Sequence, residues 1–149
     1  MNASLRKRLS GIALAAAGLL GCGESGNVPR DAPPAADYVS ASDFRRLLRE
    51  SSQPVLVEFG VMSGCPRCDA VREPVERLAQ ELRPRVHVCR VNLAYEQGLA
   101  RELGVRTCPT FMAFQGNREL FRANSSASAA DLRQLLDDCL GRSAEAAEP

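Results

Sequence analysis

The chain has 149 residues, of which 45% are hydrophobic and 25% charged, so its length and composition are those of one soluble globular domain. Its formal net charge of +1 gives no reason to expect a nucleic-acid partner. Six cysteines are many for this length and raise the question of the redox compartment, but their spacing does not suggest a scaffold of paired bridges.

Residues 1–21 have the parts of a secretory signal peptide. Three basic residues, Arg6 to Arg8, precede an apolar run from Leu9 to Leu20. A helix of that length rises about 18 Å, which is too short for a hydrocarbon core of about 30 Å. We therefore expect a cleaved signal rather than a membrane-spanning helix.

The apolar run ends in Leu19-Leu20-Gly21-Cys22, which resembles the lipobox of bacterial lipoproteins. The resemblance implies that Cys22 is lipidated and becomes the new N-terminus, and that the protein is anchored in the cell envelope, facing the periplasm. Gly23 stands where aspartate would favour the inner membrane, and it therefore favours the outer membrane. An ordinary signal peptide with an incidental cysteine is the alternative.

The next segment, residues 22–37, is predicted to be the lipidated cysteine and a flexible tether. It is rich in Gly, Ser, Ala and Pro, and it holds too little bulky apolar surface to fold. The folded domain is predicted over residues 38–141. The small and acidic residues 142–149 are predicted to form a disordered tail.

Within the predicted domain, the hydrophobic pattern alternates between helical and strand periodicity. The first elements in chain order are a helix through Phe44, Leu47 and Leu48 capped by Ser40 or Ser42, a buried strand at Val55–Phe59, and a helix after Cys65 carrying Val71, Val75, Leu78 and Leu82. A strand at Val86–Leu93 and a short helix at Glu96–Leu103, closed by Gly104, follow. The last elements are hairpin strands at Thr110–Phe114 and Glu119–Arg122 around Gly116-Asn117, and a helix capped by Ser128 with Leu132, Leu135, Leu136 and Leu140 on one face. This order predicts an α/β architecture with a central mixed sheet flanked by helices.

Cys65 and Cys68 form a C-x-x-C, which alone is ambiguous between half a zinc site, a structural bridge and a redox pair. A conventional structural zinc site is not expected, because there is no second C-x-x-C and His87 is the only histidine. The position of Cys65, after a buried strand and at the start of a helix, favours a reactive thiolate. Cys68 lies one turn later, close enough to displace a mixed disulfide.

Three motifs together resemble the thioredoxin family. Val55–Phe59 is similar to the central strand of the family, Cys65-Pro66-Arg67-Cys68 to its active site, and Gly104–Thr110 to the loop that holds its cis-proline. Pro66 also suits the first turn of a helix, where a missing N–H costs little. The motifs occur in the order and spacing of the family, and the resemblance covers about 100 residues, the whole predicted folded part, so it implies a thioredoxin-like fold.

The resemblance also implies roles for individual residues. Cys65 is the expected nucleophile and Cys68 the resolving cysteine, and Pro109 is the expected cis-proline that helps to hold an extended substrate strand. Thiol–disulfide exchange of this kind needs no cofactor beyond the protein's own dithiol. The expected partners are protein thiols and disulfides, together with another redox protein that regenerates the pair.

Glu58 matches the buried acid of the family, usually aspartate, which lies behind the resolving cysteine and assists its deprotonation. A carboxylate on a buried strand is costly unless it is paired or used, and its pKa should rise. Arg90, on the neighbouring strand, is a candidate partner. A glutamate at a strand end that reaches solvent is the alternative.

Two departures from the family stand beside the active site. The family usually has tryptophan before the first cysteine, whereas Gly64 stands there and the chain has no tryptophan. The segment between Glu58 and Cys65 is also one residue longer than in thioredoxin itself. The surface offered to partners should therefore differ from that of cytosolic thioredoxin.

The sequence leaves alternatives open for the roles of Arg67 and Cys108. Arg67 would favour the Cys65 thiolate by Coulomb attraction and make the pair more oxidising, unless its side chain points into solvent. Cys108 precedes Pro109, where the family places a residue facing the active-site pair. It is a small packing residue, part of an internal disulfide switch, or part of a thiolate cluster for a soft ion such as Cu(I).

The remaining cysteines have simpler expectations. Cys89, on a strand, is predicted to be a packed core thiol, and the sequence leaves the role of Cys139 open. The leading functional hypothesis is an extracytoplasmic thiol–disulfide oxidoreductase acting on protein cysteines. The alternatives are a copper- or metal-handling protein that uses Cys65, Cys68 and Cys108, and a binding module without catalysis.

Overall fold

The computed structural model describes residues 34–124 and 126–145 of the chain. The predicted signal peptide, Cys22 and most of the predicted tether therefore lie outside the described residues, as do the last four residues of the predicted tail. Within the described ranges, no helix combines the length and the hydropathy that a membrane crossing would need.

The described residues form one mixed sheet of five strands, in the spatial order β1-β3-β2-β4-β5. The strands are β1 (Asp37–Tyr38), β2 (Val55–Gly60), β3 (His87–Asn92), β4 (Thr110–Gln115) and β5 (Arg118–Ala123). β1, β3 and β2 run parallel to one another, whereas β4 is antiparallel to both β2 and β5.

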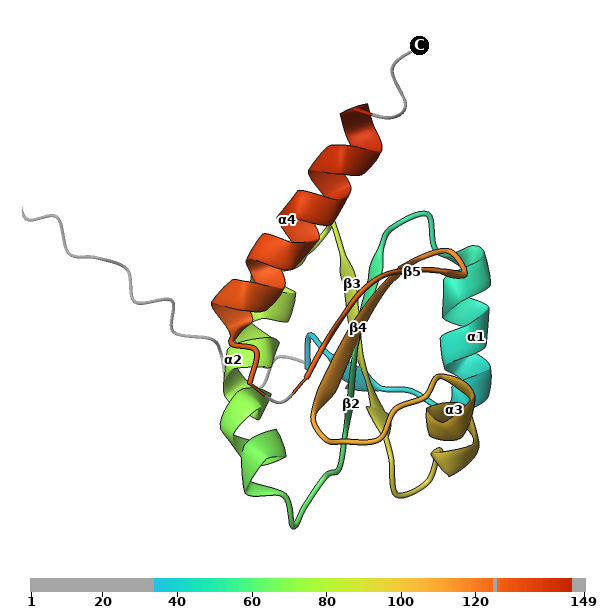
Figure 1. The fold of residues 1–149 in the computed structure, drawn as a ribbon, viewed down its shortest axis with the longest axis vertical. Helices are drawn as coiled ribbons and strands as arrows, with labels where there is room; N and C mark the ends of the chain where they lie inside the picture. The colour runs from blue at the N-terminus through green and yellow to red at the C-terminus, as the bar shows by residue number, and fades with distance from the viewer. Residues whose placement is uncertain (1–33, 125, 146–149) are drawn as a thin grey trace, which may run out of the picture. The chain divides into compact units, whose positions relative to one another are not determined.

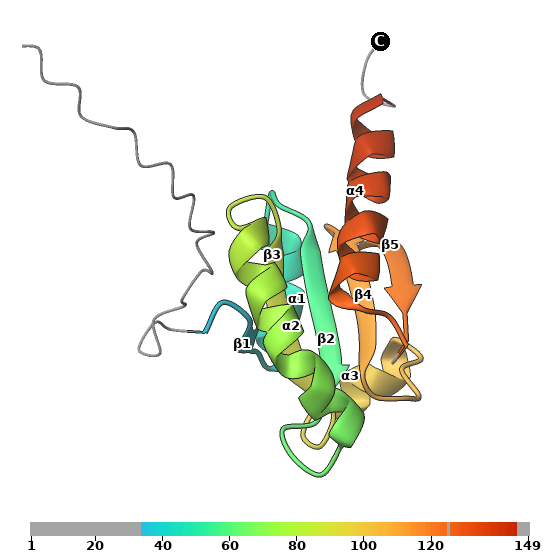
Figure 2. The same ribbon diagram turned by 90° about the vertical axis from the view of Figure 1, so that its left-hand side faces the viewer.

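Helices cover both faces of this sheet (Figures 1 and 2). They are α1 (Ala41–Glu50), α2 (Pro66–Leu82), α3 (Gln97–Glu102) and α4 (Ala129–Glu145). α2 and α4 lie on one face, and α1 and α3 lie on the other. The predicted α/β architecture, a mixed sheet flanked by helices, is confirmed.

The alternation of side chains along β2 divides the core into two layers and places Glu58. Val55, Val57 and Phe59 pack on the side of α1 and α3. Leu56 packs on the opposite side with α2 and α4. Because successive strand residues point to opposite faces, Glu58 shares the face of Leu56 and lies under α2, the helix that carries Cys68.

Local hydrogen bonds explain where two of the helices begin. Ser40 caps α1, where its Oγ accepts the backbone N–H of Asp43 at 3.1 Å. Ser128 precedes α4, and its Oγ accepts the backbone N–H of Asp131 at 3.2 Å. Each oxygen satisfies an N–H that has no partner within its helix. The predicted cap at Ser128 is confirmed, as is the first of the two alternatives for α1.

The boundaries of the fold differ from those predicted at both ends. Residues 34–37 belong to the fold rather than to the tether, since Ala36 is buried and β1 pairs with β3. A two-residue strand is too short to show a periodicity, so the sequence pattern missed it. At the other end, α4 continues to Glu145, four residues beyond the predicted limit of the domain.

Candidate active site

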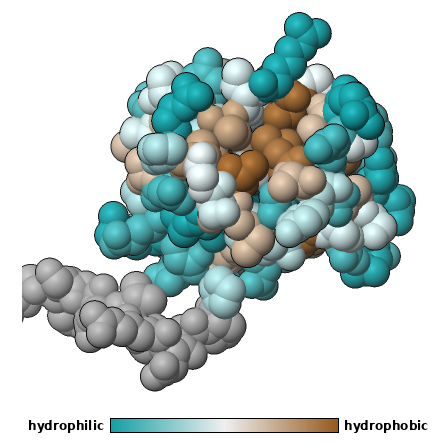
Figure 3. All heavy atoms as spheres, turned by 90° about the horizontal axis from the view of Figure 1, so that it is seen from below, coloured by the Kyte–Doolittle hydropathy of each residue, from teal (hydrophilic) through white to brown (hydrophobic). Residues whose placement is uncertain are grey.

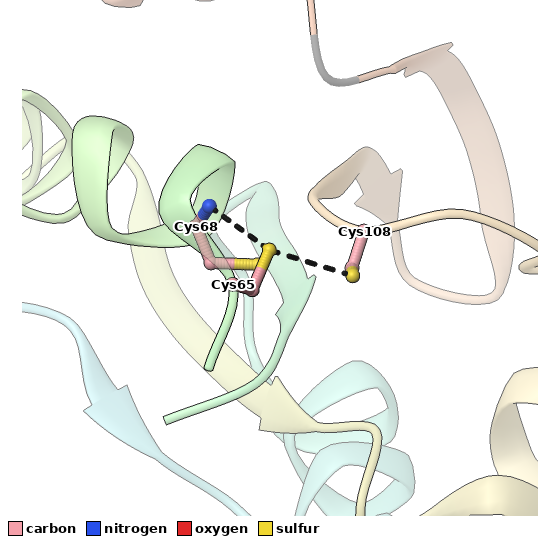
Figure 4. A group of neighbouring side chains, drawn as sticks. All are labelled: Cys65, Cys68 and Cys108. Carbon is pink, nitrogen blue, oxygen red and sulfur yellow. Dashed lines mark hydrogen bonds between the residues drawn. The ribbon is translucent and has the colours of Figure 1, made fainter. Parts of the chain in front are cut away.

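Cys65 lies at the N-cap position of α2, with Pro66 in the first turn. Its Sγ accepts the backbone N–H of Cys68 at 3.2 Å (Figure 4). The sulfur thus occupies the place of the oxygen that serine or aspartate supplies at other helix starts. A negative charge on this atom is stabilised by the unpaired N–H groups and by the helix dipole.

The two cysteines of the pair differ in acidity. A side-chain hydrogen bond from Cys68 lowers the pKa of Cys65, and the backbone N–H groups of Cys68 and Arg67 lower it further against the effect of burial. Burial raises the pKa of Cys68 to about 12. Cys65 keeps 9% of its surface exposed and Cys68 keeps 1%. The more acidic and more accessible sulfur is therefore that of Cys65.

Cys108 brings a third sulfur to the pair, as Figure 4 shows. Its Sγ lies 3.7 Å from the Sγ of Cys65, and the three sulfurs of Cys65, Cys68 and Cys108 lie within 4.8 Å of one another. Burial raises the pKa of Cys108, while the contact of its side chain with Cys65 lowers the pKa of Cys65. The Cys108–Pro109 peptide bond is cis, as the family resemblance implies.

Glu58 and Arg90 form a buried ion pair beneath α2. The Nε of Arg90 donates to a carboxylate oxygen of Glu58 at 2.9 Å, and the two residues are only 5% and 4% exposed. Arg90 also donates to the backbone oxygens of Ala36 and Arg72 and to Glu76. Burial raises the pKa of Glu58, while the guanidinium of Arg90 opposes the rise. The predicted partner of Glu58 is therefore confirmed.

Gly60 leaves a space between the acid and the resolving thiol. A Cβ at this position would lie 3.1 Å from Oε1 of Glu58 and 3.6 Å from Sγ of Cys68. The carboxylate and the thiol thus border the same small gap, which only glycine leaves open. Gly60 was not among the predicted site residues, although a glycine in a strand often marks a close approach of two groups.

Arg67 affects the acidity of both Cys65 and Cys108. Its N–H lowers the pKa of Cys65, whereas the charge of its guanidinium favours the ionised form of Cys108. The side chain is exposed and lines a cavity of about 470 Å³ next to Cys108. The charge of Arg67 therefore acts on the third sulfur, and its predicted Coulomb effect on Cys65 stays a prediction.

The loop before Cys65 explains one departure from the family. Gly64 has a φ of +77°, a conformation that residues with a side chain rarely adopt, so tryptophan would be strained there. Met62, in the same loop, is 55% exposed. Figure 3 views this end of the molecule, where hydrophobic residues form a patch in the face and hydrophilic residues surround it.

The other two described cysteines lie away from the sulfur cluster. Cys89 is fully buried in the layer under α1 and α3, and burial raises its pKa to about 12, which confirms the predicted core thiol. Cys139 is buried on α4, and its thiol donates to the backbone oxygen of Leu120 at 3.9 Å.

Comparisons with known proteins agree with this geometry. The family model described as Thioredoxin matches residues 36–138. Thioredoxin 1 of Nostoc sp. is 30% identical over 103 residues, which cover 69% of this chain and 95% of that protein. The thioredoxin of Rickettsia felis is 30% identical over 84 residues, which cover 56% of this chain and 79% of that protein.

Among solved structures, the crystal structure of chloroplastic thioredoxin z is similar in fold. It superposes with a TM-score of 0.65 at 16% identity, over 71% of this chain and 95% of that chain. At this identity the likeness bears on the fold alone.

Proposed function

Since the chain belongs to the thioredoxin family, whose members exchange thiols with disulfides, we propose that it is an extracytoplasmic, lipid-anchored oxidoreductase acting on protein cysteines through Cys65-Pro66-Arg67-Cys68. The observation that carries the proposal is the helix-capping sulfur of Cys65, which is more acidic and more exposed than its partner, the buried and protonated Cys68 one turn away.

The proposed reaction has two exchange steps. The Cys65 thiolate attacks a sulfur of the client disulfide, the client S–S bond breaks, and the client's other sulfur leaves as a thiolate. Cys68 then loses its proton and attacks Cys65, which releases the second client sulfur and leaves a Cys65–Cys68 disulfide. Two electrons pass from the dithiol to the client, and another redox protein must return them. The same steps in reverse oxidise a client dithiol.

Glu58 is the proposed acceptor of the Cys68 proton. Burial raises the pKa of this carboxylate, which makes it a better base than an exposed glutamate. Its Oε1 and the sulfur of Cys68 border the gap at Gly60. Arg90 holds the carboxylate in place through the other oxygen.

The oxidoreductase proposal is tested by reduction of insulin disulfides with dithiothreitol as electron donor. Full-length wild type should accelerate the reaction, and Cys65→Ser should remove the acceleration. Cys89→Ala is the matched control, because it removes a cysteine from the core layer away from the site. Equal activity of wild type and Cys65→Ser would refute the assignment of the nucleophile.

The location is tested separately, since it rests on the lipobox-like sequence ending in Cys22. Cells fed labelled palmitate should incorporate it into the wild-type protein and not into Cys22→Ala. The variant should also leave the membrane fraction. Wild-type protein that stays unlabelled and soluble would refute the anchor without touching the oxidoreductase assignment.

A soft-metal site is the second candidate function, favoured by the three sulfurs. Three sulfurs at about 2.3 Å from one ion lie about 4 Å apart, close to the 3.7 Å between the sulfurs of Cys65 and Cys108. Soft thiolate ligands suit Cu(I), as they suit zinc and iron–sulfur clusters. Stoichiometric copper after anaerobic purification, lost in Cys108→Ser, would support this function. Metal-free protein after incubation with Cu(I) would exclude it.

A further inference from the structure

The cavity of about 470 Å³ beside the sulfur cluster is lined by three arginines from three parts of the chain. Arg67 comes from the first turn of α2, Arg101 from α3, and Arg106 from the loop between α3 and β4. Cys108 lines the same cavity. We refer to this cavity as the arginine hollow.

The three arginines differ from most others in the described part of the chain. Eight other arginines lie within 4.0 Å of a carboxylate oxygen of Asp or Glu. Arg67, Arg101 and Arg106 are exposed and form no ion pair with any described residue. The hollow therefore concentrates uncompensated positive charge, although the net charge of the whole chain is only +1.

The hollow is also within reach of a client bound at the nucleophile. Cys108 belongs to its lining, and the Sγ of Cys108 lies 3.7 Å from the Sγ of Cys65. An extended chain advances about 3.3 Å per residue, so side chains a few residues from the client's cysteine can enter the hollow. Leu93 and Val105 supply apolar lining for the aliphatic part of such a side chain.

We propose that the arginine hollow binds the carboxylate side chains of a client protein near its reactive cysteine, so that disulfides in acidic segments are the preferred substrates. This inference rests on the proposed oxidoreductase function and names its substrate class. Arginine suits the role because its planar fork matches the two oxygens of a carboxylate. Unpaired surface charge of one sign also raises the rate of encounter with the opposite sign, an effect that salt screens.

The test uses three disulfide peptides that differ only in the residues flanking the cysteine, which are acidic, neutral or basic. The second-order rate of their reduction by the reduced full-length protein is measured at low and high salt. The double variant Arg101→Glu/Arg106→Glu is compared with Arg118→Glu. Arg118→Glu is the control for a charge reversal away from the hollow, because Arg118 is exposed at the hairpin end of β5, far along the sheet from Thr110 and the sulfurs.

Wild type should reduce the acidic peptide about two- to fivefold faster per arginine contact than the neutral one, and salt should diminish the difference. The double variant should lose or reverse the preference and keep its rate on the neutral peptide, whereas Arg118→Glu should keep the preference. Equal wild-type rates on all three peptides would overturn the inference. So would an equal change in both variants.

The two proposals fail in different ways. Reduction of the neutral peptide that disappears in Cys65→Ser supports the oxidoreductase function whatever the charge preference. If wild type reduces none of the peptides, the oxidoreductase function is refuted and the substrate preference falls with it.

Discussion

Replacing Arg90 with methionine should expose the energetic cost of the buried acid. In the wild-type fold, Arg90 compensates Glu58 at 2.9 Å, and both side chains are almost fully buried. Arg90→Met keeps much of the side-chain volume and removes the charge. Glu58 then remains in a buried site without its main partner, and the backbone oxygens of Ala36 and Arg72 lose a donor.

The expected loss of stability is large compared with the total free energy of unfolding of a small domain. Removing one partner of a buried ion pair costs about 3–5 kcal/mol. A domain of this kind is stable by about 5–15 kcal/mol. At pH 7 we therefore expect the free energy of unfolding of Arg90→Met to fall by at least about 3 kcal/mol, measured by urea denaturation of the full-length protein.

The pH dependence of this loss of stability shows whether the uncompensated charge of Glu58 causes it. Burial already raises the pKa of Glu58, and loss of the guanidinium should raise it further. When the pKa of a carboxyl is higher in the folded than in the unfolded protein, its contribution to the free energy of unfolding is fully present below the unfolded pKa. That contribution is lost as the pH rises through the folded pKa. The deficit of Arg90→Met should therefore be largest near pH 8 and shrink towards pH 5, by up to about 1.4 kcal/mol per pH unit.

Two variants serve as controls. Glu58→Gln/Arg90→Met has no carboxyl at position 58, so its own free energy of unfolding should lack the fall between pH 5 and pH 8 that Glu58 causes in Arg90→Met. Arg122→Met breaks an ion pair with Glu119 in which both side chains are more than a third exposed, and it should cost at most about 1 kcal/mol. A deficit below about 1 kcal/mol for Arg90→Met at pH 7, or one equal at pH 5 and pH 8, would refute the reasoning.

Three further predictions concern the thiols. Iodoacetamide at pH 7 should alkylate Cys65 long before Cys68, because Cys68, with a pKa of about 12, is ionised to the order of one part in 10⁵. Peptide mass spectrometry measures the labelling of each cysteine, and equal labelling of the two would contradict the assignment of Cys65 as the reactive thiol. Gly60→Ala fills the gap between Glu58 and Cys68, so rapid-quench kinetics should show slower resolution of the mixed disulfide with little change in the first attack. Equal slowing of both steps would contradict a role for the gap. Cys108→Ala removes a hydrogen bond that lowers the pKa of Cys65, so that pKa should rise in a titration of thiolate absorbance, and an unchanged value would show that the sulfur contact is unimportant.

The elements of the fold could be predicted because their signals are local. A serine before an amphipathic segment marks the start of α1 and of α4, and Gly116 with its φ of +57° marks the hairpin turn. β1 could not be predicted in this way, since its two residues are placed by pairing with β3 and by the bond from Arg90 to Ala36. These contacts join positions more than fifty residues apart.

In the candidate site too, features set by local sequence could be predicted, whereas features set by long-range packing could not. The acidity of Cys65 follows from its place at a helix start, which a single C-x-x-C after a strand already indicates. The closeness of Cys108 came from the family resemblance, because nothing in its own neighbourhood predicts a contact across 43 residues. The gap at Gly60 and the arginine hollow depend on how α2, α3 and their loops meet, and a pattern within one segment carries no information on that.

The difference between the two cysteines of the pair also explains why a buried acid is useful here. Cys68 and Glu58 lie in surroundings that raise the pKa of both, so both groups resist negative charge. If Cys68 lost its proton to solvent, a second negative charge would form beside the carboxylate, at the cost that a low-dielectric site imposes. If the proton passes to Glu58 instead, the number of buried negative charges does not change. The charge moves to the attacking sulfur and then leaves with the client's sulfur, and Arg90 lowers the cost of holding it on Glu58 until that moment.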